Sequence, residues 1–173
     1  MKGVLILLAV LVALLAVVTI VGAALPQEHA VTRQVRLNQS REAVWNAISD
    51  FGAATAWRHD LLEARQLPDH NAHPVWRETS KDGTVLTLET VESFPPHRLV
   101  RRITDTGLQF GGGWTYEITP SNGGTQLSIT ENGEVYNPIF RFVSRFVVGH
   151  KASIDAYLKA LGRKFGEEAS ITG

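Results

Sequence analysis

The sequence predicts an α+β domain in which a curved antiparallel sheet of about six to seven strands wraps around a long C-terminal helix, preceded by an N-terminal transmembrane helix. Three features of the sequence support this. An uncharged apolar run comes first, segments that alternate apolar and polar residues fill the middle of the chain, and a segment with helical spacing closes it. A single antiparallel sheet needs one face covered, and only the last helix is long enough to cover it.

The apolar run, residues 4–25, contains no charge and one hydroxyl, that of Thr19. As a helix it spans roughly 33 Å, which suffices for a hydrocarbon core of roughly 30 Å. We expect residues 1–25 to form an uncleaved single-pass membrane anchor, because the apolar core of a signal peptide usually runs only about 7–15 residues. A cleaved signal peptide is the alternative.

Charges around the run bear on the side of the membrane that the domain faces. Lys2 precedes the run, which favours a cytoplasmic N-terminus and a domain on the extracytoplasmic side. Arg33, Arg36 and Arg41 argue for the other orientation, but we assign them to the folded domain. Residues 26–29 are expected to be a linker, residues 30–168 the domain, and residues 169–173 a tail.

The elements follow in order from periodicity and turn chemistry. Polar residues 38–40 supply cap chemistry for a short helix over 41–49, and a second short helix is expected at 51–57. Asp82-Gly83 lies between alternating segments and predicts a hairpin. The strands are expected at residues 30–37, 61–67, 75–80, 84–94, 98–105, 114–119 and 126–135.

The closing segment, residues 138–168, predicts one long helix. Its apolar stripe recurs at intervals of three and four residues, and includes Ile139, Phe146, His150 and Tyr157. A strongly bent sheet does not keep close contact with a straight helix along its whole length, so we expect an apolar cavity between the two layers.

Composition excludes several classes of protein. The chain has 173 residues with 17 basic and 17 acidic side chains, so it lacks the charge of a nucleic-acid binder. It has no cysteine, which excludes disulfide frameworks, thiolate metal sites and cysteine nucleophiles. The sequence also contains no phosphate-binding loop, nucleophile elbow or zinc-protease motif, and we expect no cofactor.

Local motifs resemble a known family. Residues 40–51 (SREAVWNAISDF) resemble the first-helix signature of the polyketide cyclase/dehydrase and lipid-transport group of the START/Bet v 1-like (SRPBCC) superfamily, and Trp57 lies where that group often carries tryptophan. Residues 112–118, 129–135 and 156–161 are similar to its membrane-anchored bacterial members. The resemblance covers about residues 30–168 and implies the helix-grip fold. It implies little about activity, because members bind lipids, hormones and polyketides and only some catalyse.

Strand parity and the helical stripe select the candidate ligand-binding residues. If Trp114, Tyr116 and Ile118 face the helix, Arg101 and Glu131 bring charges towards the cavity, where they must pair, reach the rim or meet a ligand. His150 is either a hydrogen-bonded core histidine or a ligand contact able to exchange a proton. The expected site comprises Arg101, Trp114, Tyr116, Ile129, Glu131, Phe146, His150 and Tyr157.

Two other segments carry open alternatives. The motif formed by Asp69, His70 and His73 could hold a metal, but no obvious further ligand accompanies it at a fixed spacing. We therefore expect no metal site. Residues 139–148 interleave arginine with bulky apolar side chains. They could contact lipid headgroups, although a helix end packed on its own sheet is the simpler interpretation.

These observations predict a membrane-tethered protein that binds or transports a lipid or another hydrophobic small molecule. Its partners are then that molecule and the bilayer, reached through residues 4–25, and not nucleic acid. The alternative is a polyketide cyclase or dehydratase that uses His150 as acid and base, but no second strong acid–base partner accompanies this histidine, so we expect no catalytic residue. A structural module with a filled cavity is a third possibility.

Overall fold

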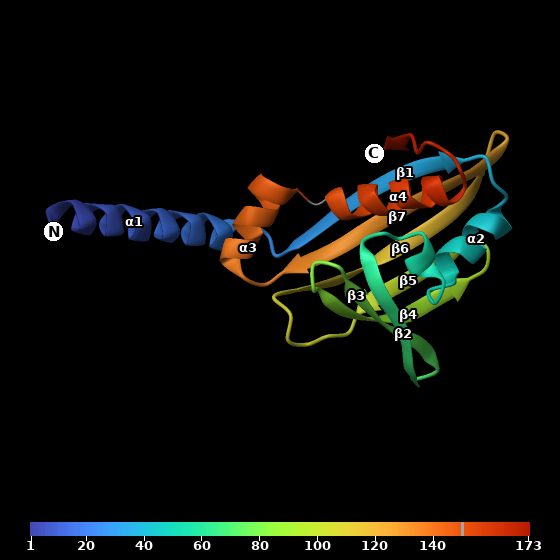
Figure 1. Ribbon diagram of the computed structural model, residues 1–173, viewed down its shortest axis with the longest axis horizontal. Helices are drawn as coiled ribbons and strands as arrows, with labels where there is room; N and C mark the ends of the chain where they lie inside the picture. The colour runs from blue at the N-terminus through green and yellow to red at the C-terminus, as the bar shows by residue number, and fades with distance from the viewer. Residues whose placement is uncertain (150) are drawn as a thin grey trace.

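One antiparallel sheet organises the chain, whose computed structural model describes residues 1–149 and 151–173 (Figure 1). Within these residues the sheet has eight strands in the order β2-β3-β4-β5-β6-β7-β1-β8. The prediction of six to seven strands is corrected to eight, because part of the expected tail forms β8 and pairs with β1. The strands are β1 Glu28–Leu37, β2 Leu61–His70, β3 His73–Ser80, β4 Val85–Phe94, β5 Arg98–Ile103, β6 Phe110–Ser121, β7 Gly124–Val135 and β8 Ile171–Thr172.

Two short helical segments follow β1, as the sequence predicts. Helix α2 (Arg41–Ser49) begins where the Ser40 hydroxyl accepts a hydrogen bond from the Ala43 amide at 3.1 Å, a common N-cap. It buries Val44, Trp45 and Ile48 against the sheet. The second segment is a single 3₁₀ turn, η1 (Ala54–Ala56).

The predicted strand parity is confirmed in β6 and β7. Tyr116 pairs with Ile129 and Ile118 pairs with Leu127, and all four side chains are buried in the core. Trp114 pairs with Glu131 in the same register. Since successive side chains in a strand point to opposite faces, these residues all project from the face that the C-terminal helix covers.

The C-terminal segment is the main correction to the sequence prediction. In place of one helix over residues 138–168, the chain forms α3 (Pro138–Val143), a π-helical turn η2 (Ser144–Val148) and a separate helix α4 (Ala152–Lys164). Gly149 lies between them with φ +78°, a left-handed conformation that glycine adopts readily and that ends a right-handed helix. The three-to-four spacing continues across the break, so periodicity alone did not reveal it.

Helix α4 packs on the sheet and closes the core (Figure 1). Ile154, Leu158 and Leu161 are at most 2% exposed and share one apolar cluster with residues of β1 and β7. A short ion pair fastens the helix to β1, since Arg33 Nε lies 2.6 Å from Asp155 Oδ1. The two layers of the predicted fold are therefore present, with a shorter covering helix than expected.

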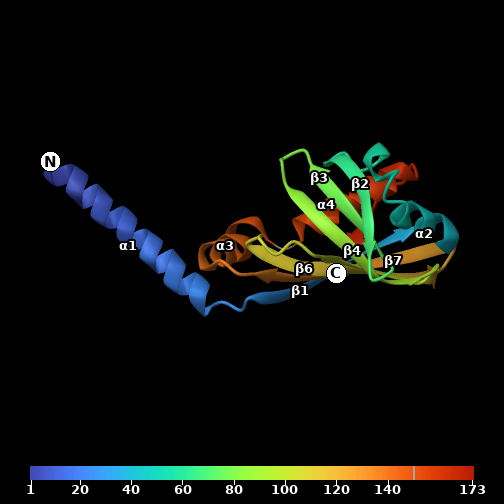
Figure 2. The ribbon, with the colours of Figure 1, turned by 90° about the horizontal axis from the view of Figure 1, so that it is seen from below.

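Helix α1 (Lys2–Ala24) projects away from the domain (Figures 1 and 2). Its length and composition would allow it to cross a membrane, a property that a signal sequence shares. Its C-terminal end packs on α3: a Cβ atom on Gly22 would overlap the carbonyl oxygen of Pro138. Arg141 Nη1 donates to the Leu25 carbonyl at 3.0 Å, so the end of α1 and the start of α3 are joined. Strand β1 begins at Glu28, within the expected linker.

Candidate ligand-binding site

Two adjoining hollows lie between the sheet and the C-terminal helices. The inner hollow, of about 290 Å³, lies between the sheet and α4. The outer hollow, of about 360 Å³, lies between the sheet and the α3–η2 segment. They share Leu86, Trp114 and Ser153 as walls, and both are open to solvent rather than enclosed. We call the two hollows together the groove. The sequence predicted an internal cavity between the sheet and the helix, and the structure has this open groove there instead.

The inner hollow combines apolar walls with a small charged cluster. Its apolar part is formed by the sheet and by one face of α4. Its charged part is formed by the segment between η1 and β2, by β3 and by β5. Few polar groups converging in an apolar pocket are typical of small-molecule sites. The hollow is lined by Arg58, Asp60, Glu78, Ser80, Leu86, Leu88, Arg101, Trp114, Tyr116, Ile129, Ser153, Ile154, Ala156 and Tyr157.

Arg101, on β5, is the most unusual residue of this hollow. It is 4% exposed, and Nη1 donates to Glu78 Oε1 at 2.5 Å. Its guanidinium group lies over the ring of Phe51, 3.9 Å from the centroid. Within the described part of the chain, Nε and Nη2 have no hydrogen-bond partner. Buried donors without partners are rare and costly, so each calls for an explanation.

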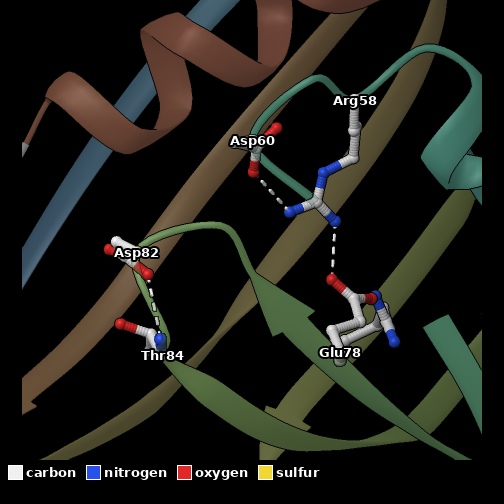
Figure 3. A network of polar contacts seen from close by, with 6 residues as sticks. Arg58, Asp60, Glu78, Asp82 and Thr84 are labelled. Atoms are coloured by element: carbon white, nitrogen blue, oxygen red, sulfur yellow. Dashed lines mark hydrogen bonds and ion pairs between the residues drawn. The ribbon is translucent and has the colours of Figure 1, made fainter. Parts of the chain in front are cut away.

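Glu78 lies between two arginines, Arg58 and Arg101, and Figure 3 shows its contact with Arg58. Its second oxygen, Oε2, accepts from Arg58 Nη1 at 2.6 Å, while Arg58 Nη2 donates to Asp60 Oδ2 at 3.0 Å. Burial alone would raise the pKa of Glu78, but the charges of Arg101 and Arg58 and their hydrogen bonds outweigh it, so the pKa lies below its ordinary value. Burial alone would likewise lower the pKa of Arg58, yet Glu78 and Asp60 raise it above its ordinary range. Glu78 and Arg58 are therefore both ionised at neutral pH.

Two tyrosines complete the inner hollow. The rings of Tyr116 and Tyr157 lie 5.8 Å apart, and Tyr157 also packs edge-on against Trp57 at 5.2 Å. Burial is the main reason that the pKa of each phenol is raised above its ordinary value. Both hydroxyls stay protonated at neutral pH and can donate a hydrogen bond to a bound oxygen.

Glu131 occupies the outer hollow and is also paired. Its Oε2 accepts from Trp114 Nε1 at 2.9 Å and from the Ser153 hydroxyl of α4 at 3.1 Å. Its Oε1 lies 3.2 Å from Nε2 of His29. Glu131 therefore links β1, β6 and α4 at the point where the two hollows meet.

The predicted site residues can now be placed. Arg101, Trp114, Tyr116, Ile129 and Tyr157 line the inner hollow, and Trp114 and Glu131 line the outer one. Whether they bind a ligand stays a prediction. Phe146 was expected on the cavity wall, but it lies on η2, is 60% exposed and lines neither hollow, because the break at Gly149 places η2 outside the stripe of α4. His150 lies outside the described residues.

Sequence reasoning missed Arg58 and Glu78. Both belong to segments rich in polar residues. In such segments the sequence pattern does not distinguish a charged side chain that is buried from one that is exposed. His70 and His73, considered as metal ligands, both contact the carboxylate of Glu89, through Nδ1 at 3.0 Å and 2.7 Å respectively. These histidines lie away from the groove residues described above.

A larger depression of about 660 Å³ lies on the other face of the sheet. It is lined by the alternate residues of the same strands, including Val100, Arg102 and Thr115. Arg102 is exposed, in contrast to its neighbour Arg101. The groove is the better candidate because its apolar walls surround buried charges with unused donors.

Comparison with known proteins defines the class. The sequence profile of the family described as polyketide cyclase/dehydrase and lipid transport matches residues 28–166. The chain therefore belongs to this family, within the START/Bet v 1-like (SRPBCC) superfamily. No curated protein matches the chain.

Solved structures support the fold. A START superfamily protein from Mycobacterium smegmatis is 18% identical with a TM-score of 0.64, covering 79% of this chain and 96% of its own. The Zhui aromatase/cyclase from Streptomyces sp. R1128 is 13% identical with a TM-score of 0.63, covering 79% of this chain and 93% of its own. Norcoclaurine synthase from Thalictrum flavum is 11% identical with a TM-score of 0.62, covering 80% and 93%. At these identities the similarity establishes the helix-grip fold and leaves function to the site.

Proposed function

We propose that this protein binds a lipid or similar hydrophobic small molecule in the groove, with a polar, preferably anionic, head group directed at Arg101. The observation that carries the proposal is the pair of unpartnered donors, Nε and Nη2, on a nearly fully buried arginine in the wall of the inner hollow. Both atoms are covered, so a head group must move a neighbouring side chain to reach them; its carboxylate or phosphate oxygen would then supply the missing acceptor through a charge-assisted hydrogen bond.

The local charge balance supports an anionic head. Arg58 and Arg101 share the single buried carboxylate of Glu78, while Asp60 is 53% exposed and reaches solvent. The buried part of the cluster thus carries one positive charge in excess. The phenols of Tyr116 and Tyr157 add two neutral donors nearby.

The apolar walls supply the binding energy. Leu86, Leu88, Ile129 and Ile154 line the inner hollow, and Trp114 separates it from the outer one. Each Å² of apolar surface removed from water contributes roughly 25 cal/mol to the free energy of binding. The buried surface of an acyl chain would therefore supply the affinity, while Arg101 orients the head group.

We further propose that α1 is retained and tethers the domain to a membrane, with the domain on the extracytoplasmic side. The support is the length and apolar character of α1, its exposure on nearly all sides, and its packing on α3, which a signal sequence has no need to make.

A fatty-acid probe tests the ligand proposal. cis-Parinaric acid becomes fluorescent in an apolar site, and its methyl ester serves as the uncharged counterpart. We expect the protein to prefer the acid. Arg101→Gln should weaken binding of the acid by about ten- to hundredfold, as expected for loss of a charge-assisted hydrogen bond, and leave the ester unaffected.

Arg102→Gln is the matched control, since Arg102 neighbours Arg101 on β5 but is exposed on the other face. Native mass spectrometry of detergent-purified protein should show a co-purified amphiphile that Arg101→Gln loses and Arg102→Gln retains. Equal affinity for acid and ester, or equal effects of the two substitutions, would refute the role of Arg101.

One observation favours an enzyme as the second candidate. Two protonated phenols without hydrogen-bond partners in the described chain lie beside Arg101, where they could polarise a carbonyl group. A cyclase or dehydratase of this kind should convert a poly-β-ketone thioester, and Tyr157→Phe should abolish turnover while leaving the fold intact. Failure to detect turnover with this substrate class leaves binding as the function.

A further inference from the structure

The segment formed by α3 and η2 exposes large apolar side chains next to the end of α1. Phe140, Phe146 and Val147 are 51%, 60% and 72% exposed. Isolated exposed apolar residues are ordinary, but neighbouring ones indicate an interaction surface. The simpler interpretation of the sequence, a helix end packed on its own sheet, does not hold for these three side chains.

The structure holds this segment at a defined place relative to α1. Asn137 caps α3, accepting hydrogen bonds from the amides of Ile139 and Phe140. Arg141 then binds the segment to α1 and to β7's end, donating from Nη1 to the Leu25 carbonyl and from Nη2 to the Tyr136 carbonyl, each at 3.0 Å. Figures 1 and 2 show α3 beside the C-terminal end of α1, and η2 follows α3 directly. If α1 spans a bilayer, α3 and η2 are therefore close to its surface.

The outer hollow lies beside this surface. Phe140 and Ser144 form its wall on the side of α3, and Phe110 and Val135 contribute further apolar wall from the sheet. Trp114 lines both hollows, so the outer hollow adjoins the inner one. Side chains of the two adjoining hollows therefore extend from Phe140 of α3 to the wall that contains Arg101.

We propose that α3 and η2 rest on the phospholipid monolayer where α1 leaves it, and that the outer hollow is the port through which a lipid passes between the bilayer and the inner hollow. The occupant of the exposed face is the lipid surface itself. Phe146 and Val147 enter the boundary between head groups and acyl chains, and the exposed Arg145, which precedes them in the sequence, meets lipid phosphates. This inference rests on the proposed tether and ligand class.

Single-cysteine labelling tests the membrane contact, because the chain contains no cysteine of its own. Phe146→Cys and Phe94→Cys, each labelled with NBD, form a matched pair, since both phenylalanines are 60% exposed. Phe94 is the last residue of β4. The turn that follows it contains His97, which contacts Arg41 of α2. This end of the sheet lies far from α1 (Figure 1). The full-length protein is reconstituted in vesicles of phosphatidylcholine and phosphatidylglycerol.

At position 146 the NBD emission should shift to the blue and be quenched several-fold more by lipid-borne doxyl groups than at position 94. Equal, water-like emission at the two positions would overturn the membrane contact.

Photolabelling tests the port. The same vesicles containing a phospholipid with a diazirine acyl chain should label the η2 peptide and also the peptide that contains Trp114. Labelling of η2 alone would overturn the port. Binding of parinaric acid in detergent tests the groove without any bilayer. If the ligand site is wrong, that binding fails. If only the port is wrong, that binding is retained while photolabelling in vesicles misses the peptide that contains Trp114.

Discussion

At the scale of single residues, Glu78 sets the charge balance of the groove. It is the one buried carboxylate that both Arg58 and Arg101 contact in the described chain, with 6% of its side chain exposed. Two buried cations around one anion are stable only while that anion remains charged. The same arrangement leaves Nε and Nη2 of Arg101 without partners in the described chain, which is the observation behind the proposed ligand contact.

Glu78→Gln should therefore destabilise the domain strongly. Removing one partner of a buried ion pair typically costs about 3–5 kcal/mol, because the remaining charges lose their compensation. Chemical denaturation at pH 7 measures the difference in unfolding free energy. Glu63→Gln is the control, since Glu63 is exposed on β2 and its replacement should change stability by no more than about 0.5 kcal/mol.

The pH dependence of this difference follows from the lowered pKa. Because the pKa of Glu78 in the fold lies below its ordinary value of 4.5, its contribution is fully present above pH 4.5 and is lost as the pH falls through the lowered pKa. The gap between wild type and Glu78→Gln should narrow below pH 4.5. A gap that stays constant from pH 7 to acid would show that the charge of Glu78 is not what stabilises the cluster.

Residue patterns predicted part of this site. Strand parity correctly placed Trp114, Tyr116 and Ile129 on the groove side, because alternation is a local property of a strand. It also identified Arg101 as a charge on the apolar face. Strand parity did not predict that Glu78 is the partner of Arg101, because only the pairing of β3 with β4 and of β4 with β5 brings these two residues together.

At the scale of elements, the junction of α1 and α3 depends on close approach. Gly22 lies against the backbone of Pro138, where no side chain fits without displacing one helix. Gly3, near the other end of α1, has open space around the position of a Cβ atom. The two glycines differ in packing although both lie in the same apolar helix.

Gly22→Val should separate α1 from α3, and Gly3→Val should leave them joined. Arg141 is 8% exposed, and one of its two backbone partners is the Leu25 carbonyl at the end of α1, so separation removes that hydrogen bond and should make the side chain and its peptide bond more accessible. We expect limited trypsin digestion to cut after Arg141 much faster in Gly22→Val than in wild type or in Gly3→Val. Equal cleavage rates in the two variants would contradict a packed junction.

The covering helix shows where periodicity misleads. The apolar stripe predicted one helix, but Gly149 divides it into two segments with different neighbours: α3 packs on α1, while α4 packs on the sheet. The residues on either side of the break keep helical spacing, so their pattern is the same with or without it. Phe146 was misplaced for this reason.

At the scale of the whole molecule, the domain should fold without α1. Within the described residues α1 meets the domain mainly at α3, through Gly22 and the Leu25 carbonyl, whereas the core lies between α2, α4 and the sheet. Removing residues 1–25 should lower the melting temperature by only a few degrees, about what the loss of one hydrogen bond causes. Differential scanning fluorimetry measures this shift.

Carbonate extraction of membranes completes that test. The full chain should remain in the pellet and the truncated chain should be released, because α3 and η2 alone bind only at the surface. An intact mass that lacks about the first 23 residues, or a full chain that carbonate releases, would show a cleaved leader in place of the anchor.

Sequence patterns correctly predicted the properties that depend on near neighbours along the chain: an apolar helix at the start, strands with one buried face, and the family to which the domain belongs. Three features became visible only in the tertiary structure: the helix break at Gly149, the packing of α1 on α3, and the cluster of Arg58, Glu78 and Arg101. Each of these joins segments that are separated along the chain or depends on where a segment packs, so no local period encodes it.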